Sequence, residues 1–317
     1  MPHPEELRFR AGDASLAATL TLPDAADGRV PWAVLVGSWL PRDRDGDWDR
    51  AGHAGWFAPP ARHATAGLFA RLADALAERG VASLRYDPRG CGESDGAWEE
   101  VDLFTRIDDA RDAIGAMRSR PELDLRRTAI VGHGEGGLIA MSVAIGDPAI
   151  GAVGLIGPPA RSLRDVLRRG VAERSRTGAD RQHPVVEALD GAAEELIERA
   201  ERREPRMSLT VGDATASLRL DGWEQAIHTP ALALATMLHR NVVIAHGMSD
   251  AWADPDESRL IAAVVPDALR LEVTGAGHAL DEAPHQRIAE IADALAARIE
   301  PRELPPVLLA IEEMGSG

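Results

Sequence analysis

The apolar residues of this chain gather in short, uninterrupted runs that alternate with longer amphipathic stretches. Runs that are so short and so uniformly apolar are typical of parallel strands buried on both faces, and not of exposed helices. The stretches between them carry apolar residues at helical spacing. The predicted strands are 32–36, 81–84, 128–131, 152–156, 242–245 and 269–273, and the helices predicted among them include 66–79, 104–118, 136–145 and 256–264.

The alternation of strands and helices predicts an α/β fold with a doubly wound, mostly parallel sheet and right-handed crossovers. In the last helix an apolar residue recurs every three or four positions over 288–299, which gives one stripe that packs on the sheet. Two β-patterned segments, 6–10 and 15–22, precede the alternation and are joined by a turn-forming Ala-Gly-Asp cluster. We therefore expect an antiparallel hairpin at the N-terminus.

The alternation is interrupted once, between Pro159 and Thr229. This segment is rich in Arg and Glu, is amphipathic over 163–174 and 185–203, and contains no run that would extend the sheet. We interpret it as an inserted helical cap, with a solvated helical excursion of no particular role as the alternative. The expected domains are an α/β core at 1–160 and 229–300, a helical cap at 161–228 and a C-terminal tail at 301–317.

Composition narrows the range of functions. The 317 residues are 45% hydrophobic, enough for one large core that carries an insertion. The net charge of −16 would repel polyanions over most of the surface, so we expect neither nucleic-acid nor membrane binding. All 35 basic residues other than histidine are arginine. The absence of lysine excludes Schiff-base chemistry, a pyridoxal phosphate site and the lysine of a phosphate-binding P-loop.

Cys91 is the single cysteine, so neither an intrachain disulfide nor a cysteine-rich metal site can form. No metal and no cofactor is expected. The N-terminus has no apolar signal region, and no stretch reaches the roughly 18 apolar residues that a membrane span needs. We therefore expect a cytoplasmic protein, and we leave its oligomeric state open.

The strongest local signal is a glycine-rich turn at 131–137, directly between a predicted strand and a predicted helix. Its sequence, Val-Gly-His-Gly-Glu-Gly-Gly, has the spacing of a G-x-S-x-G nucleophile elbow, with Gly134 where the serine is expected. Small flanking residues suit this turn, because it is strained and brings the strand close to the helix. A degenerate dinucleotide-binding loop would look similar, so the context of the turn must decide.

Two polar residues supply that context. Asp250 follows the predicted strand 242–245, and His278 follows the next predicted strand, 269–273. The carboxyl ends of parallel strands meet at one edge of the sheet, where ligands bind, so Gly134, Asp250 and His278 are expected to lie together there. Their chain order, nucleophile, acid and histidine, is the order of a catalytic triad in one class of hydrolases. We therefore predict a catalytic dyad of Asp250 and His278.

At this point the sequence resembles the α/β-hydrolases, and within them the serine-aminopeptidase-like and dienelactone-hydrolase-like esterases. The resemblance covers nearly the whole chain. It rests on the Leu-Val-Gly-Ser segment at 35–38, Asp-Arg-Asp-Gly at 43–46, Ala-Leu-Ala-Glu-Arg-Gly at 75–80, and the segment 85–94, Arg-Tyr-Asp-Pro-Arg-Gly-Cys-Gly-Glu-Ser, together with the elbow, Asp250 and His278.

The resemblance implies further site residues. In such enzymes the loop after an early strand supplies one N–H group of the oxyanion hole, which carries over to Ser38 or Trp39. The residue after the nucleophile supplies the other, here Glu135. Trp39 and His133 are expected to contact the substrate.

Two departures from the family pattern bear on activity: Gly134 replaces the nucleophile, and Ser-Trp-Leu-Pro at 38–41 replaces a smaller, glycine-rich loop. Removing the nucleophile of a serine hydrolase costs about a millionfold in turnover. Cys91 is a poor substitute, because it lies on a different loop and suits a small residue packed in a turn. The fold therefore transfers from the family, whereas covalent ester hydrolysis does not.

Three functions stay open. In the first, which we favour, His278 oriented by Asp250 acts as a general base on a small carbonyl or ester molecule, without a covalent intermediate. Lyase-type elimination, isomerisation and cyclisation all fit that equipment. In the second, the chain is a carboxylic-ester or acyl hydrolase whose catalytic serine has been mutated to Gly134 to trap substrate. The third is a binding protein without activity, which has no reason to keep both Asp250 and His278.

Overall fold

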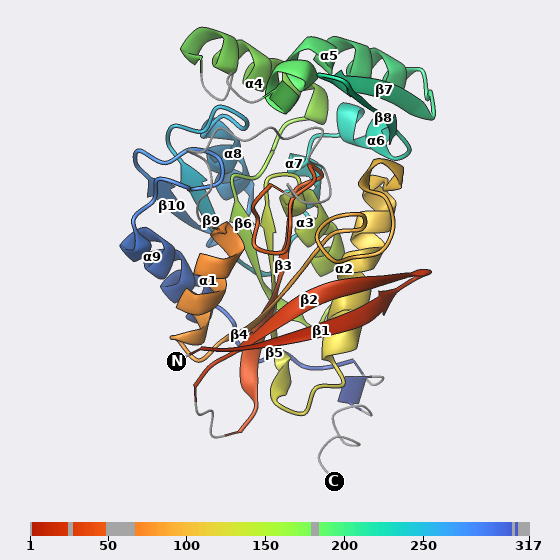
Figure 1. Ribbon diagram of the computed structural model, residues 1–317. Helices are drawn as coiled ribbons and strands as arrows, with labels where there is room; N and C mark the ends of the chain where they lie inside the picture. The colour runs from red at the N-terminus through yellow and green to blue at the C-terminus, as the bar shows by residue number, and fades with distance from the viewer. Residues whose placement is uncertain (1, 25–27, 49–66, 179–183, 306–307, 310–317) are drawn as a thin grey trace.

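The computed structural model describes residues 2–24, 28–48, 67–178, 184–305 and 308–309 (Figure 1). One eight-stranded sheet runs through these residues in the order β1-β2-β4-β3-β5-β6-β9-β10. β1 is antiparallel to β2 and β2 to β4, and the other neighbouring strands are parallel. The strands are β1 (His3–Ala11), β2 (Ala14–Leu22), β3 (Val30–Val36), β4 (Ala82–Tyr86), β5 (Leu123–His133), β6 (Ile150–Ile156), β9 (Asn241–Gly247) and β10 (Leu269–Val273).

The expected α/β fold, with its mostly parallel sheet and N-terminal antiparallel hairpin, is confirmed. All six strands predicted for the parallel part form. The largest difference is in β5, which begins at Leu123 instead of Thr128 and pairs with β6 through an irregular register near Thr128. The apolar run thus located the buried centre of this strand and missed its partly exposed beginning.

Helices cover both faces of the sheet (Figure 1). Successive residues of a strand point to opposite faces, so Val34 of β3 packs in the cluster that contains Ile114 and Ile139, whereas Leu35 packs in the cluster that contains Leu72 and Ile291. The first face carries α2 (Leu103–Met117), α3 (Gly136–Gly146), α7 (Leu232–Ala235) and α8 (Asp256–Val264), and the second carries α1 (Leu68–Ala77) and α9 (His285–Ala296).

Local sequence explains where these helices begin and which face they bury. Asp102 caps α2, because its side chain accepts a hydrogen bond from the Thr105 N–H group. The stripe expected over 288–299 is buried at Ile288, Ile291 and Leu295. The predicted start of α1 at Ala66 lies outside the described residues, and the described helix begins at Leu68. No helix in the described part of the chain is long and apolar enough to cross a membrane.

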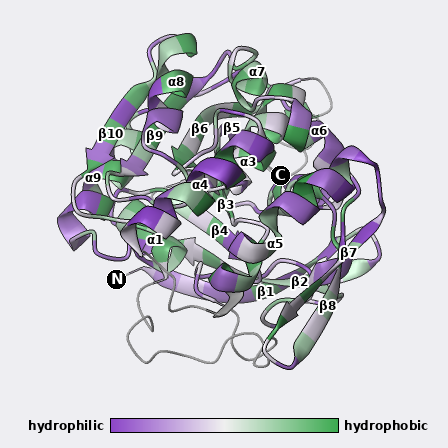
Figure 2. Ribbon diagram, turned by 90° about the horizontal axis from the view of Figure 1, so that it is seen from above, coloured by the Kyte–Doolittle hydropathy of each residue, from purple (hydrophilic) through white to green (hydrophobic). Residues whose placement is uncertain are grey.

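Residues 163–178 and 184–228, which lie between β6 and β9, cover the C-terminal edge of the parallel strands, as both views show (Figures 1 and 2). The sequence predicted a helical segment here, but the segment also contains an antiparallel hairpin. β7 alternates between exposed and buried residues, β8 begins with alternating partly buried and exposed residues, and Gly212 and Asp213 join the two strands. The elements are α4 (Leu163–Thr177), α5 (Pro184–Glu201), β7 (Arg206–Val211), β8 (Ala214–Arg219) and α6 (Trp223–His228).

The expected C-terminal tail is packed over part of its length. Leu304 and Leu308 are buried in a small cluster with Leu125 and Ala149. Arg302, Pro305 and Leu309 are partly buried, Pro301 and Glu303 are exposed, and the remaining positions of 301–317 lie outside the described residues. The segment that follows α9 thus packs on an apolar surface formed by the start of β5 and the turn before β6.

A close approach of β3, β5 and α3 requires glycine at the start of α3. A Cβ atom on Gly136 would lie 2.3 Å from the Val36 carbonyl oxygen and 2.7 Å from that of Gly37. These neighbours are backbone atoms and cannot move aside without displacing the strand. The first turn of α3 therefore sits against the end of β3, which brings the loops after β3 and β5 together.

Gly136→Ala should destabilise the fold by about 3 kcal/mol, because the added methyl group overpacks the contact with β3. Gly115→Ala is the control, since a Cβ on this glycine near the end of α2 would meet no atom within 4 Å. That change should be neutral or stabilise by up to about 1 kcal/mol. Urea unfolding of both variants measures the difference, and equal midpoints would contradict the close approach.

Candidate active site

Gly134 lies in the turn between β5 and α3, just beyond the C-terminal end of the strand. Its φ of +57° is in the left-handed region, where a side chain is strained. Its N–H group donates to the Ile156 carbonyl of β6 at 2.8 Å, and its carbonyl accepts from the Gly137 N–H group at 2.9 Å. The turn therefore has the backbone expected of a nucleophile elbow, built on a residue without a side chain.

Asp250 and His278 come together at this edge of the sheet. Asp250 follows β9 and is buried, and His278 lies in the loop after β10 with 15% of its side chain exposed. His278 Nδ1 is 2.8 Å from Asp250 Oδ2. Because a carboxylate can only accept, Nδ1 carries the hydrogen and Nε2 is left free to accept a proton.

The carboxylate of Asp250 is held by four donors. Its Oδ1 accepts from the backbone N–H groups of Trp252 at 2.7 Å and Ala253 at 2.9 Å. Its Oδ2 faces His278 and also His246 Nε2, which is 3.1 Å away. Burial alone would raise the pKa of Asp250, but the nearby His278 and the hydrogen bonds from both histidines hold it well below its usual range. Asp250 is therefore ionised at any working pH.

The other nitrogen of His278 faces the elbow at close range. A Cβ atom on Gly134 would lie 2.9 Å from His278 Nε2 and 3.6 Å from the Ser38 Cβ. The first distance is shorter than real Cβ contacts allow, so the imidazole occupies part of the space that a side chain at position 134 would need. The imidazole of His278 therefore lies close against the elbow.

The residues expected to form an oxyanion hole lie beside the elbow. Glu135 is the N-cap residue of α3, and Ser38, Trp39 and Glu135 all line the pocket described below. Burial raises the pKa of the Glu135 carboxyl, and the Arg106 guanidinium at 3.0 Å and a backbone hydrogen bond from Trp39 counteract this rise. The backbone of Trp39 therefore contacts the Glu135 side chain.

His133 does not line the pocket, although the sequence analysis expected it to contact substrate. It is buried, and its Nε2 is 3.0 Å from the carbonyl oxygen of His278. Its ring lies against the His278 ring, with 4.6 Å between centroids, and meets Phe69 edge to face. Burial holds the pKa of His133 well below its usual value, so the ring is neutral. His133 supports the backbone of His278 from behind.

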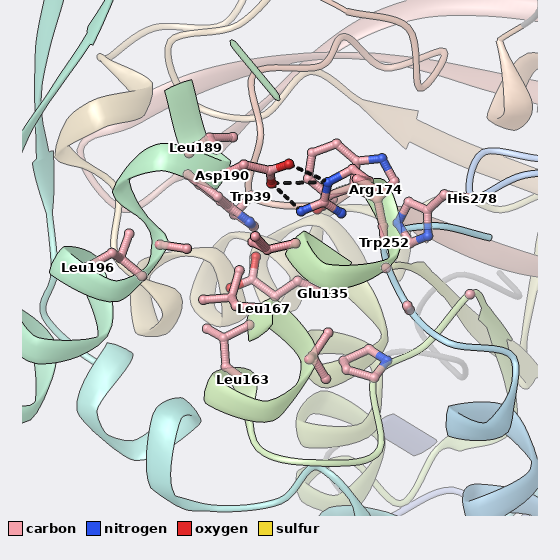
Figure 3. A pocket seen from close by; sticks show the side chains of 18 of the residues that line it. Trp39, Glu135, Leu163, Leu167, Arg174, Leu189, Asp190, Leu196, Trp252 and His278 are labelled. Carbon is pink, nitrogen blue, oxygen red and sulfur yellow. Dashed lines mark hydrogen bonds and ion pairs between the residues drawn. The ribbon is translucent and has the colours of Figure 1, made fainter. Parts of the chain in front are cut away.

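An apolar pocket opens above the elbow, between the sheet edge and the helices α4 and α5 (Figure 3). Gly134, Glu135 and His278 lie on its core side. Three indole rings contribute to its wall, from Trp39, Trp223 and Trp252, and Trp39 and Trp223 meet edge to face at 5.1 Å. Leu163, Leu167, Leu189 and Leu196 line it from α4 and α5.

The pocket also contains an ion pair that no sequence pattern indicated, between Arg174 of α4 and Asp190 of α5 (Figure 3). The Arg174 guanidinium also donates to the Ala251 carbonyl at 2.9 Å and stacks on the Trp252 ring at 4.3 Å. Arg174 is buried, and no pattern in the sequence distinguished it from the other arginines of its helix. It connects the segment above the sheet with the loop that carries Asp250.

Cys91 does not replace the missing nucleophile. Its side chain is buried in a cluster with Trp98 and residues of β7 and β8, and it is not among the described residues that line the pocket. It is the small residue packed in a turn that the sequence analysis preferred.

The fold is similar to those of solved structures. Est1E from Butyrivibrio proteoclasticus, with ferulic acid bound, has a similar fold, with a TM-score of 0.65 at 16% identity over 92% of this chain and 99% of that one. The α/β hydrolase GrgF from Penicillium has a TM-score of 0.60 at 18% identity over 94% and 99%.

A curated relative matches over a shorter stretch. Acyltransferase drtE from Aspergillus calidoustus is 32% identical over 104 residues, which are 30% of this chain and 34% of that protein. This chain thus spans about a third of the relative that it matches. Residues 61–280 match the family described as serine aminopeptidase, S33. The chain therefore belongs to the serine-aminopeptidase-like family of α/β hydrolases.

Proposed function

We propose that this protein is an enzyme that uses His278, oriented by Asp250, as a general base on a small carbonyl or ester molecule, without a covalent intermediate. The observation that carries the proposal is that Nε2 of His278 faces Gly134, which has no group to attack a substrate. His278, hydrogen-bonded to the ionised Asp250, then acts directly on the substrate or on a water molecule.

The chemistry follows from the tautomer of His278. Asp250 holds the hydrogen on Nδ1, so the lone pair of Nε2 is directed to the elbow and can take a proton from an acidic C–H group or from water. The negative charge that forms on the carbonyl oxygen would be stabilised by the N–H group of Glu135, at the N-terminus of α3, and by that of Ser38. Elimination, isomerisation and cyclisation all need a general base and a site that stabilises an oxyanion. Water-mediated hydrolysis also fits these two features, though less well.

The pocket supports an uncharged, largely apolar substrate. The charged side chains at the pocket already have oppositely charged partners, because Arg174 is paired with Asp190 and Glu135 with Arg106. A charged group on the substrate would lose its water without gaining a free partner. The segment above the sheet, 161–228, would act as a cap that shapes the pocket and excludes solvent.

A second candidate function is ester or acyl hydrolysis by a protein whose natural residue at position 134 is serine. The left-handed φ of Gly134 favours it, because a nucleophile elbow uses this strained conformation. The short distance from a Cβ atom to His278 Nε2 speaks against it, since the imidazole would have to move to admit a serine.

Turnover should depend on both members of the dyad. His278→Ala is expected to lower it by about a hundredfold or more, because a general base contributes at least that much. Asp250→Asn should leave substrate binding intact and lower turnover heavily, because the imidazole loses its orientation. The measurement is a turnover assay on a panel of uncharged carbonyl compounds and esters. Equal rates for the unmodified chain and His278→Ala would favour a binding protein.

A fluorophosphonate probe should leave the unmodified chain unlabelled, because the position that faces His278 Nε2 is Gly134, which has no hydroxyl. Gly134→Ser should gain labelling if the imidazole moves aside, and Gly134→Ala is its matched control, with the same Cβ atom and no hydroxyl. Intact-mass spectrometry of the three proteins gives the answer. Labelling of the unmodified chain at Ser38 or Cys91 would show that the nucleophile lies elsewhere.

An ester should bind more tightly than its free acid. The His278→Ala variant, which leaves the ester intact, is titrated with ethyl cinnamate and with cinnamate, and the quenching of tryptophan fluorescence is followed. The ester is expected to bind about tenfold more tightly or better, equivalent to ~1.4 kcal/mol, because the acid must enter beside Asp190 and Glu135. Tighter binding of the acid would mean that Arg174 leaves Asp190 to receive it.

A further inference from the structure

We propose that His246 is a positioning residue that shares the Asp250 oxygen facing His278, and so sets how strongly Asp250 holds the Nδ1 hydrogen of His278. The observation is that two imidazoles donate to one carboxylate oxygen, at 2.8 Å from His278 and 3.1 Å from His246. The inference rests on the dyad of the proposed function, but it concerns the resting protein and needs no substrate.

The contacts of His246 determine its tautomer. The ring is fully buried in β9, and its Nε2 lies 3.1 Å from Asp250 Oδ2 and 3.0 Å from the Ala253 carbonyl oxygen. Both partners are acceptors, so Nε2 carries the hydrogen. Nδ1 is buried and has no hydrogen-bond partner among the described residues. A second hydrogen on Nδ1 would be left without an acceptor, so the neutral ring with a hydrogen on Nε2 fits the site.

The two oxygens of Asp250 have different tasks. Oδ1 is held by the N–H groups of Trp252 and Ala253, at 2.7 and 2.9 Å, which fix the orientation of the carboxylate. His246 is therefore not needed to aim Oδ2 at His278. Its donated hydrogen instead withdraws electron density from Oδ2, the oxygen that His278 uses.

Sharing this oxygen has a consequence for the base. Because Oδ2 serves two donors, its bond to the Nδ1 hydrogen of His278 is weaker than it would be with a single donor. His133 is the neighbouring ring on the other side of His278, and burial keeps its pKa low, so it adds no charge there. Arg174 approaches the same loop, but its charge is bound by Asp190. The shared oxygen thus tunes the dyad from within the core.

The experiment compares His246→Leu, which has no donor, with His246→Gln, whose amide nitrogen can donate from about the place of Nε2. The readout is the low-field proton NMR resonance of the His278 Nδ1–H group, assigned by its loss in His278→Ala. His246→Leu should move this resonance further downfield, because Oδ2 then serves one donor and binds it more strongly. His246→Gln should keep it close to its position in the unmodified chain.

Two results would overturn the proposal. An unchanged resonance in folded His246→Leu would leave His246 with a purely structural role, and a lost resonance would mean that His246 orients Asp250 instead of sharing its charge. If His246→Leu does not fold, nitrogen-15 labelling of histidine in the unmodified chain still tests the idea. It should show His246 with hydrogen on Nε2 and none on Nδ1, and the opposite tautomer would refute the shared donor. Because no substrate is used, these results stand apart from the success or failure of the proposed reaction.

Discussion

The buried carboxylate of Asp250 is the constraint around which the site is arranged. An ionised carboxyl without partners would be costly to place inside the protein, so the chain must bring donors to it from several directions. Two come from the backbone just after it, one from His246 in the strand before it, and one from His278 after the next strand. The ends of β9 and β10 are therefore tied together by the residue that also sets the tautomer of His278.

The same loop connects the site with the segment above it. Trp252, whose N–H group binds Asp250, lies under the guanidinium of Arg174, and Arg174 also binds the adjacent Ala251 carbonyl. Asp190 in turn holds the guanidinium from α5. A movement of α4 or α5 would therefore be felt at the loop that carries the acid. The pocket and the dyad are parts of one hydrogen-bonded arrangement, although they come from distant parts of the sequence.

The sequence predicted the features that depend on periodicity and chain order. Buried strands and their end residues follow from short apolar runs, which is why the elbow, Asp250 and His278 could be assigned from the sequence to one edge of the sheet. Features set by three-dimensional contacts were missed. The signal for the hairpin β7–β8 was present, in alternating residues around Gly212-Asp213, but the Arg- and Glu-rich surroundings masked it. Nothing in the sequence showed that Arg174 points inward, that His133 turns behind His278, or that His246 reaches Asp250.

The left-handed backbone at Gly134 has a consequence for mutational history. At an ordinary turn the backbone would first have to adopt the left-handed conformation before a new side chain could act as a nucleophile. At Gly134 the backbone already has this conformation. Glycine and serine codons such as GGC and AGC differ in a single base. In a family whose members share this turn, one nucleotide change and a small shift of the imidazole would then separate covalent from non-covalent chemistry. Either chemistry could arise from the other while the protein stays folded.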